Sequence, residues 1–325
     1  MRFQLDDSEY SEFRRLTFDG GRHRLFASGD VIAGDCERLC ELVRKHNLVH
    51  AVICFDSPGG DAVEGLRLGR FIRKSGFDTD VRHRKFEYDK GPIAICASAA
   101  AYAYAGGIFR YYSESVGKLG LHQFAPADGA SLDHEITQLF VADVVQYFSE
   151  MGVNISTFVL ASRIQNSQMG WLTDQAAATL QFCNNGLNKT TSEIKVADGM
   201  YYLKLEQLTD KVTSRVLIHR VEGKTSISSG IVTNPDRTAE LATSTTSSYL
   251  ELDSDEIQRE VGNLGTYPDD HTLWIIRSLT QIQIDALIEC NSIGTWIENS
   301  GPMRWGALLD LTSVKSSVIQ FFKNT

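Results

Sequence analysis

The sequence lacks the features that mark membrane and secreted proteins. It contains no run of about 18 apolar residues, so we expect no membrane-spanning helix. The N-terminal stretch MRFQLDDSEYSEFRR has no apolar segment of the kind found in a secretory signal peptide. These absences favour a cytoplasmic protein without a membrane partner, or a periplasmic one if a leader has been removed.

An excess of positive charge is also absent. Lys and Arg number 32 against 41 Asp and Glu, which gives 32 − 41 = −9 and argues against general nucleic-acid binding. The six cysteines include no C-x-x-C pair, and in a chain of 325 residues this favours reduced thiols over disulfides or a metal site. We therefore expect no nucleic-acid partner, no metal and no cofactor.

Apolar runs alternate with helical repeats through residues 1–190. AVICF at 51–55 is typical of a buried strand, and DAVEGLRLGRFIRKSG at 61–76 has the spacing of a helix. Such alternation favours α/β layers with parallel strands. Further strands are expected at 24–32, 79–85 and 118–124, and further helices at 33–47, 96–107, 131–152, 156–164 and 172–181.

The composition changes near residues 186–200. The stretch NNGLNKTTSEIKVADGM is polar and contains glycine, which is typical of a linker. We predict one α/β domain at 1–190 and a second, smaller α+β domain of unknown role at 195–325, and we find no sequence repeat. In the second domain, strands are expected at 201–208, 214–223 and 272–279, a Ser/Thr-rich stretch at 243–249, and a helix at 313–322.

The tetrapeptide Ser-Pro-Gly-Gly stands at 57–60, between the strand at 51–55 and the helix that follows it. Pro58 fixes its own φ and keeps Ser57 extended, whereas Gly59 and Gly60 reach backbone conformations closed to other residues. Unpaired N–H groups at such a turn can stabilise an anion, either a phosphate or a developing oxyanion. A tight turn without a ligand is the alternative.

Two further residues carry reactive groups. Ser98 lies among small residues in ICASAAAYAYAGG, where a substrate backbone can approach its hydroxyl. His122 follows a short apolar run in KLGLHQF, and an imidazole there can act as base for a serine nucleophile. Taken singly, Ser98 also fits a helix N-cap or a small buried residue, and His122 fits a histidine at the edge of the core.

The order S-P-G-G, C-A-S-A, a doubled glycine and then G-L-H-Q resembles the Clp-protease/crotonase superfamily, specifically its Clp-protease-like serine peptidase branch. It is similar in particular to predicted periplasmic Clp-like proteins of bacteria. The resemblance covers roughly residues 25–185, and its specificity lies in the order and spacing of short motifs. It implies a layered core in which parallel sheets form a spiral.

The resemblance also implies a role for each motif. Ser98 matches the nucleophile and His122 the general base, and the backbone N–H groups of Gly60 and Ala99 match the oxyanion hole. One such donor lowers the barrier by roughly 3 to 4 kcal/mol in known enzymes. The helix at about 132–150 matches the family's handle, which packs between subunits in rings. A peptide or protein substrate and a homo-oligomer are therefore expected.

The acid of the family's triad has no match here. Aligning WLT with the family's pattern places Met169 at the acid position, and no carboxylate lies between Arg163 and Leu172. Asp174 follows Thr173 and is expected in the first turn of a helix. Asn166 or Ser167 could orient the imidazole instead, as an amide does in cysteine peptidases, or Ser98 and His122 could act as a dyad.

Three functions are compatible with these residues. The first is a serine hydrolase of the peptidase type that works through an acyl-enzyme on Ser98. The second is a weakly active or inactive scaffold whose C-terminal domain binds a partner, and the missing acid motivates it. The third is a crotonase-type acyl-CoA enzyme, which the sequence favours least because it contains no clear CoA-binding segment.

Overall fold

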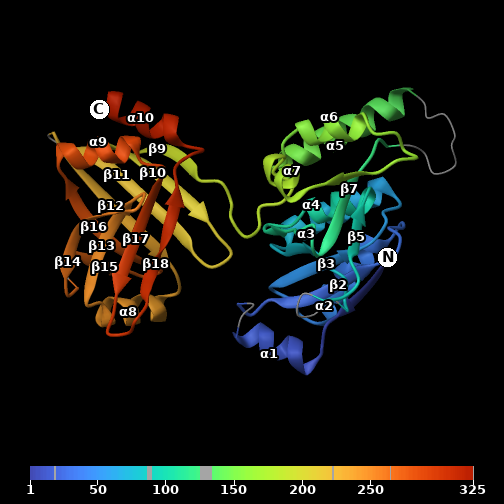
Figure 1. The fold of residues 1–325 in the computed structure, drawn as a ribbon, viewed down its shortest axis with the longest axis horizontal. Coiled ribbons are helices and arrows are strands. Elements are labelled where there is room, and N and C mark those ends of the chain that lie inside the picture. The colour runs from blue at the N-terminus through green and yellow to red at the C-terminus, as the bar shows by residue number, and fades with distance from the viewer. Residues whose placement is uncertain (18–19, 86–89, 125–133, 222, 264, 325) are drawn as a thin grey trace. The chain divides into compact units, whose positions relative to one another are not determined.

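The alternation of apolar runs and helical repeats builds parallel strands with helices between them (Figure 1). The computed structural model describes residues 1–325 except 18–19, 86–89, 125–133, 222, 264 and 325. The chain divides into unit 1, Met1–Gly186, and unit 2, Leu187–Thr325. Unit 1 contains β1 Arg2–Leu5, α1 Glu9–Thr17, β2 His23–Ser28, α2 Asp35–Lys45, β3 Ala51–Asp56, α3 Ala62–Lys74, β4 Asp78–Val81, β5 Ala94–Ala97, α4 Ala99–Ala105, β6 Arg110–Tyr111, β7 Gly117–Leu121, α5 His134–Glu150, α6 Ser156–Ser162, β8 Gly170–Leu172 and α7 Asp174–Thr179.

Unit 1 has two sheets that meet at the Ser-Pro-Gly-Gly turn. The larger sheet has the order β1-β2-β3-β4-β6, with β1 antiparallel and the other strands parallel. The smaller sheet has the order β5-β7-β8, with β5 and β7 parallel and β8 antiparallel. At the junction Ser57 N donates to Ile95 O at 2.5 Å, and Ala97 N donates to Ser57 O at 3.1 Å. The turn therefore fixes the end of β3 beside the end of β5.

Helix α4 lies at the centre of unit 1, and all seven of its residues are buried. Two glycines of α3 allow close packing against it. A Cβ at Gly65 would lie 2.3 Å from Ala99 O, and one at Gly69 would lie 1.8 Å from the Tyr147 hydroxyl of α5. Tyr147 in turn donates to the carbonyl of Tyr102 at 2.6 Å. The helix that begins after Ser98 is thus held rigidly by two neighbours.

Two expectations for unit 1 were wrong in their bounds. The segment 96–107 does not form a single helix, because Ala94–Ala97 pairs as β5 with β7 and Cys96 is fully buried in the sheet. The strand expected at 79–85 ends at Val81, where pairing with β3 stops. The parallel α/β layers follow the sequence pattern, and none of the described helices is long and apolar enough to span a membrane.

Unit 2 is an α+β structure of two antiparallel sheets. The larger sheet has the order β15-β16-β12-β11-β10-β9, and the smaller one β14-β13-β17-β18. Its core is aliphatic and draws on both sheets and on helices α8, α9 and α10. The elements are β9 Thr191–Ala197, β10 Met200–Leu208, β11 Thr213–Val221, β12 Lys224–Val232, α8 Pro235–Ser244, β13 Ser247–Leu252, β14 Asp255–Val261, β15 Thr266–Asp269, β16 Thr272–Leu279, α9 Gln281–Glu289, β17 Ser292–Glu298, β18 Arg304–Asp310 and α10 Lys315–Asn324.

The stretch expected to be a linker is partly a strand. Residues 191–197 pair with β10 along their whole length, with Ile194 opposite Leu203 and Val196 opposite Tyr201. Apolar and charged residues alternate in this segment, which is the period of a strand with two unlike faces. The polar composition concealed that period because only two of the seven residues are large and apolar.

Unit 2 also repeats a β-β-α-β-β arrangement, although no repeat is visible in the sequence. The order β11-β12-α8-β13-β14 recurs as β15-β16-α9-β17-β18. The N-caps Asn234 and Thr280 are 46 residues apart, as are the buried Leu241 and Leu287. Corresponding strands pair across the centre, β12 with β16 and β13 with β17. The two halves are therefore related by an approximate two-fold axis.

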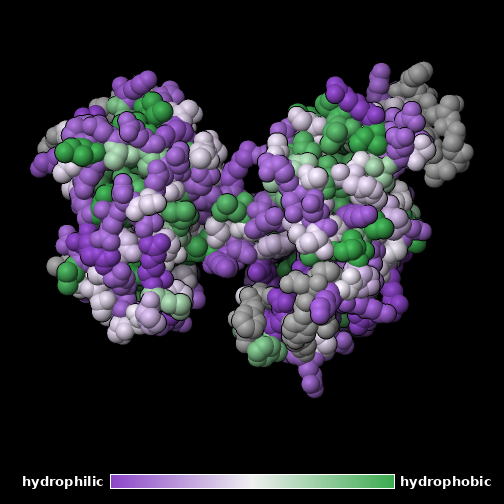
Figure 2. All heavy atoms as spheres, viewed as in Figure 1, coloured by the Kyte–Doolittle hydropathy of each residue, from purple (hydrophilic) through white to green (hydrophobic). Residues whose placement is uncertain are grey.

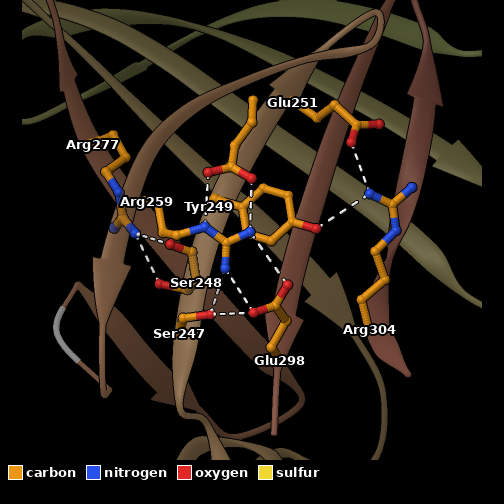
Figure 3. Close-up of polar contacts among 9 residues, drawn as sticks. Ser247, Ser248, Tyr249, Glu251, Arg259, Arg277, Glu298 and Arg304 are labelled. Carbon is orange, nitrogen blue, oxygen red and sulfur yellow. Dashed lines mark hydrogen bonds and ion pairs between the residues drawn. The ribbon is translucent and has the colours of Figure 1, made fainter. Parts of the chain in front are cut away.

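A network of ion pairs covers one face of the smaller sheet of unit 2 (Figure 3). Arg259 donates to Glu256 and Glu298 at 2.6 to 2.7 Å, and its guanidinium lies over the Tyr249 ring. Arg304 contacts Glu251 at 2.8 Å. Each of these guanidinium groups has both a carboxylate partner and an aromatic ring, so the face satisfies its own charges.

Candidate functional site

Ser98 occupies a backbone conformation that non-glycine residues seldom adopt. It lies between β5 and α4 with φ 55° and ψ −124°. Strain of this kind costs about 1 to 3 kcal/mol and is found at functional sites, including the nucleophile turn between a strand and a helix. Its backbone is fixed on both sides, because Ser98 N donates to Gly120 O at 3.0 Å and Ser98 O accepts from Ala101 N at 3.0 Å.

The Ser98 hydroxyl does not cap the helix that it precedes. This observation disfavours the interpretation of Ser98 as an N-cap, because such a residue would accept a hydrogen bond from N2 or N3 of the helix. The Ser98 side chain is partly exposed and is not enclosed in the core. The strained backbone therefore presents a hydroxyl that the helix itself does not use.

The glycine turn lies directly against Ser98. Gly59 has φ 111°, and a Cβ there would lie 2.7 Å from both Ala97 O and Ser98 Cβ. Gly60 has φ 136°, and a Cβ there would lie 2.2 Å from Val31 O. Val31 N donates to Gly59 O at 2.7 Å, which ties the turn to the chain after β2. Both positions require glycine, and no sequence motif indicates that Val31 takes part.

Two backbone N–H groups beside Ser98 lack acceptors. Within the described residues, neither the N–H of Gly60 nor that of Ala99 donates a hydrogen bond. Gly60 is exposed at the turn, and Ala99 is the first residue of α4, where no intrahelical acceptor exists. These are the two donors that the motif resemblance assigns to an oxyanion hole. Their lack of partners is what such a hole requires before a substrate binds.

Because β5 and β7 are parallel, Ser98 and His122 follow the two strands at the same end of the smaller sheet. Ala97 pairs with Gly120 in the parallel ladder of β5 and β7, and His122 follows the end of β7. No hydrogen bond joins the Ser98 hydroxyl to the imidazole among the residues that the structure describes. Catalytic hydrogen bonds are often long before substrate binds, so the pairing of strands is the evidence for proximity.

The buried nitrogen of the imidazole, His122 Nδ1, has no hydrogen-bond partner among the described residues. Burial lowers the pKa of His122 from its usual value near 6.5, and a hydrogen bond with the backbone of Gln123 acts in the opposite direction. Because burial disfavours the charged ring, His122 is neutral near pH 7, the protonation state that a general base needs.

Met169 occupies the place where an acid would face His122. Leu121 pairs with Gly170 in the ladder of β7 and β8, so Met169 continues that register opposite His122. A Cβ at Gly120 would lie 2.7 Å from Met169 Cγ and 2.6 Å from the ring of Trp171. A thioether therefore packs against β7 where the family resemblance places a carboxylate.

Neither Asn166 nor Asp174 forms a hydrogen bond with His122 Nδ1 among the described residues. Asn166 is exposed, and no hydrogen bond joins it to His122 in the described structure. Its segment does lie near, because Gln123 N donates to Ile164 O at 2.9 Å. Asp174 begins α7 behind the cap residue Thr173, as expected, and accepts a hydrogen bond from Glu114 N at 2.8 Å.

The expected handle corresponds to α5, and the first two residues of its expected range lie outside the described residues. Val144 and Phe148 are buried in the core of unit 1, so this half of the helix packs within the chain. Ile136 and Leu139 are 56% and 66% exposed. Figure 2 shows apolar side chains gathered over α5 and α6. Ile136 and Leu139 therefore lie outside the core into which the second half of α5 packs.

Comparison with known proteins gives a likeness in structure alone. No protein-family model matches the chain, and no curated protein matches it. Among solved structures it is similar to the 1510-N membrane-bound stomatin-specific protease S97A mutant, at 18% identity over 49% of this chain and 75% of that one, with a TM-score of 0.34. It is also similar to ClpP1 from Listeria monocytogenes, at 16% identity over 50% of this chain and 88% of that one, with a TM-score of 0.37. The structures found include Clp-type proteases, the class that the sequence motifs resemble.

Proposed function

We propose that unit 1 is a serine hydrolase of the peptidase type. The strained backbone of Ser98, which lies against the glycine turn and beside two unpaired N–H groups, carries the proposal. A strained residue needs a compensating benefit, and presentation of a nucleophile is the benefit known for this kind of strand-to-helix turn. The chemistry that these groups support is acyl transfer.

In the proposed reaction, Ser98 Oγ attacks the carbonyl carbon of a peptide bond while His122 accepts the hydroxyl proton. The N–H groups of Gly60 and Ala99 stabilise the oxyanion that forms. Collapse of the tetrahedral intermediate breaks the C–N bond, and His122 returns the proton to the leaving amine. Water then attacks the acyl-enzyme by the same route, which releases the carboxylic acid and restores Ser98.

The absence of an acid should make this enzyme slow. In the serine-protease template, an acid that accepts from the imidazole holds the ring and stabilises its charged form, and its loss costs about 10⁴-fold in kcat. Here Nδ1 is buried without a partner, so the imidazolium that forms during attack gains no such stabilisation. We infer that Ser98 and His122 act as a dyad with a low basal rate.

We propose peptides or unfolded protein segments as substrates, in a cytoplasmic homo-oligomer. The substrate class follows from the motif resemblance, and the oligomer from the exposed Ile136 and Leu139 on α5. Isolated large apolar residues are normal on a surface, but a contiguous set on one helix is typical of an interface.

A library of fluorogenic peptides and activated esters tests the hydrolase. The wild-type chain should turn over at least one substrate, Ser98→Ala should lose that activity, and Ser156→Ala on the exposed start of α6 should keep it. Thermal unfolding of all three proteins checks that they are folded. Turnover that survives Ser98→Ala would contradict the assignment of the nucleophile.

A binding scaffold is the second candidate, and the unpartnered Nδ1 of His122 is the observation that favours it. A scaffold needs the fold but neither a neutral base nor an open oxyanion hole. It predicts no turnover of any substrate in the library and identical unfolding curves for wild type and Ser98→Ala.

A further inference from the structure

The two outer strands of the larger sheet in unit 2 differ in how they are protected. At one edge, β15 has four residues and contains Pro268, which cannot donate to a further strand. At the other edge, β9 has seven residues and contains neither proline nor glycine. It pairs with β10 on one side only. A long edge strand without such protection is a template for pairing with another strand.

The face of β9 that continues the core is uncovered over part of its length. Ile194 and Leu203 are paired and share this face, yet Leu203 is fully buried whereas Ile194 is 56% exposed. The next pair on that face, Val196 and Tyr201, is 58% and 60% exposed. Helix α10 reaches only the start of the strand, where Ser192 bonds to Ser317 at 2.9 Å. An apolar strip therefore extends past the last covered position toward the sheet edge.

The opposite face of β9 carries one charge of each sign around Ile194. Glu193 and Lys195 are about half exposed and lie 3.0 Å apart, with no other ion partner in the described structure. An antiparallel strand centred on Ile194 would place position 193 of one copy opposite position 195 of the other, on both sides of the axis. Two opposite-charge pairs would then face each other across the new ladder. A parallel arrangement in register would instead set like charges side by side.

We propose that β9 pairs with β9 of a second copy of this chain, antiparallel, about a two-fold axis through Ile194. The larger sheets of unit 2 in two copies would join into one continuous sheet, with Ile194 against Ile194 at the axis and Val196 opposite Ser192 of the second copy. This is an isologous interface, in which one surface is its own partner. The pattern of charge is what identifies a second copy rather than an unrelated strand, because β9 is complementary to itself.

A single cysteine tests the axis directly. In Ile194→Cys the two thiols of a pair would face each other, because directly opposite residues in antiparallel strands have Cα atoms about 4.5 to 5.5 Å apart and disulfides span about 4.4 to 6.8 Å. Lys195→Cys is the matched control, since its own counterpart would lie diagonally at about 7 to 8 Å. We expect mild oxidation of the full chain to give a reducible covalent dimer with Ile194→Cys, at several times the yield of Lys195→Cys or of wild type.

Charge reversal tests the same pairing without new thiols. Glu193→Lys should weaken dimerisation about tenfold or more in sedimentation or light scattering, because Lys would face Lys twice. The double variant Glu193→Lys/Lys195→Glu should restore the wild-type affinity, since opposite charges again face each other. Glu260→Lys on the edge strand β14 is the control for a change of net charge and should have no effect.

Several outcomes would overturn the proposal. Equal crosslinking of Ile194→Cys and Lys195→Cys, or failure of the double variant to restore a weakened dimer, would show that β9 does not pair with itself about this axis. The proposal would also be overturned if the wild-type chain stayed monomeric at about 100 times the concentration of an ordinary assay. The same holds if β9 paired only with a different protein. None of these readouts requires hydrolase activity, so they are independent of the proposed reaction.

Discussion

Polar groups around Ser98 lack hydrogen-bond partners in the described structure, whereas the charged side chains on the smaller sheet of unit 2 are paired. Around Ser98, two backbone N–H groups and His122 Nδ1 have no partner among the described residues, and the serine itself is strained. On the sheet face, Arg259 and Arg304 are each bonded to carboxylates and stacked on a ring (Figure 3).

The difference separates stability from function. Unpaired buried polar groups cost free energy, so each one calls for an explanation, and use by a ligand or a reaction is one such explanation. Polar groups that pair with each other are explained by their contribution to local stability. Isolated buried atoms without a partner also occur in unit 2 among the described residues, so what distinguishes unit 1 is that such groups gather beside the strained Ser98.

Removal of an unpaired group should harm activity and spare the fold. We expect His122→Ala to lower kcat/KM by about 10³-fold or more while the unfolding temperature stays the same or rises, since a buried atom without a partner is removed. Arg259→Ala should do the reverse, with unchanged activity and a loss of about 1 kcal/mol or less. Hydrolysis rates and thermal unfolding of both variants measure these effects. A loss of stability in His122→Ala together with a loss of activity in Arg259→Ala would contradict the comparison.

Crowding of the glycine turn should have a large effect on both stability and activity. Gly59→Ala introduces a Cβ at 2.7 Å from Ser98 Cβ, in addition to a positive φ. Gly76→Ala is the control, because Gly76 also has a positive φ of 69° but has open space around it. Chemical denaturation should show a cost of about 1 kcal/mol for Gly76→Ala and about 3 kcal/mol or more for Gly59→Ala. Equal costs would mean that Gly59 is not packed against Ser98.

A carboxylate opposite His122 should complete a triad. We expect Met169→Asp to raise kcat about tenfold or more, because the imidazolium gains a counter-ion, whereas the uncharged Met169→Asn should gain little.

The pH profile gives this variant a second readout. The neutral imidazole is the active form, so wild-type activity should fall as the pH drops through a His122 pKa below about 6.5. A nearby carboxylate raises that pKa, so the acidic limb of Met169→Asp should move to higher pH. A limb that stays in place would show that position 169 does not face the ring.

Relief of strain at Ser98 should give the smallest effect. Ser98→Gly and Ser98→Ala both remove the nucleophile, but only glycine adopts φ 55° and ψ −124° without cost. We expect Ser98→Gly to be more stable than Ser98→Ala by about 1 kcal/mol in denaturant titrations. If alanine were the more stable of the two, the strained conformation would not be that of the protein in solution.

Much of unit 1 could be predicted from its sequence because its signals are local. The apolar run at 51–55 and the helical repeat after it are clear patterns, and the structure has β3 and α3 at these positions. The motif order predicts that Ser98 and His122 belong to one site, but it does not predict β5, which pairs with β7 directly before Ser98.

The remaining features of the fold and the site depend on contacts that produce no recognisable pattern in the sequence. Strand β12 was missed because KTSISSGIV is rich in serine, yet it lies at the centre of a sheet where the Ser229 hydroxyl bonds to Thr295. The alignment of WLT anticipates the position of Met169, but strand β8 could not be predicted because its three residues are too few to show a period. Strain at Ser98 is likewise a property of the folded backbone alone.

Mass spectrometry of the chain after treatment with a fluorophosphonate tests the central claim most directly. The account predicts one adduct per chain, mapped to Ser98, that forms faster as the pH rises through the His122 pKa and is absent from Ser98→Ala. Labelling of another serine, or none under conditions that label a known serine hydrolase, would contradict it.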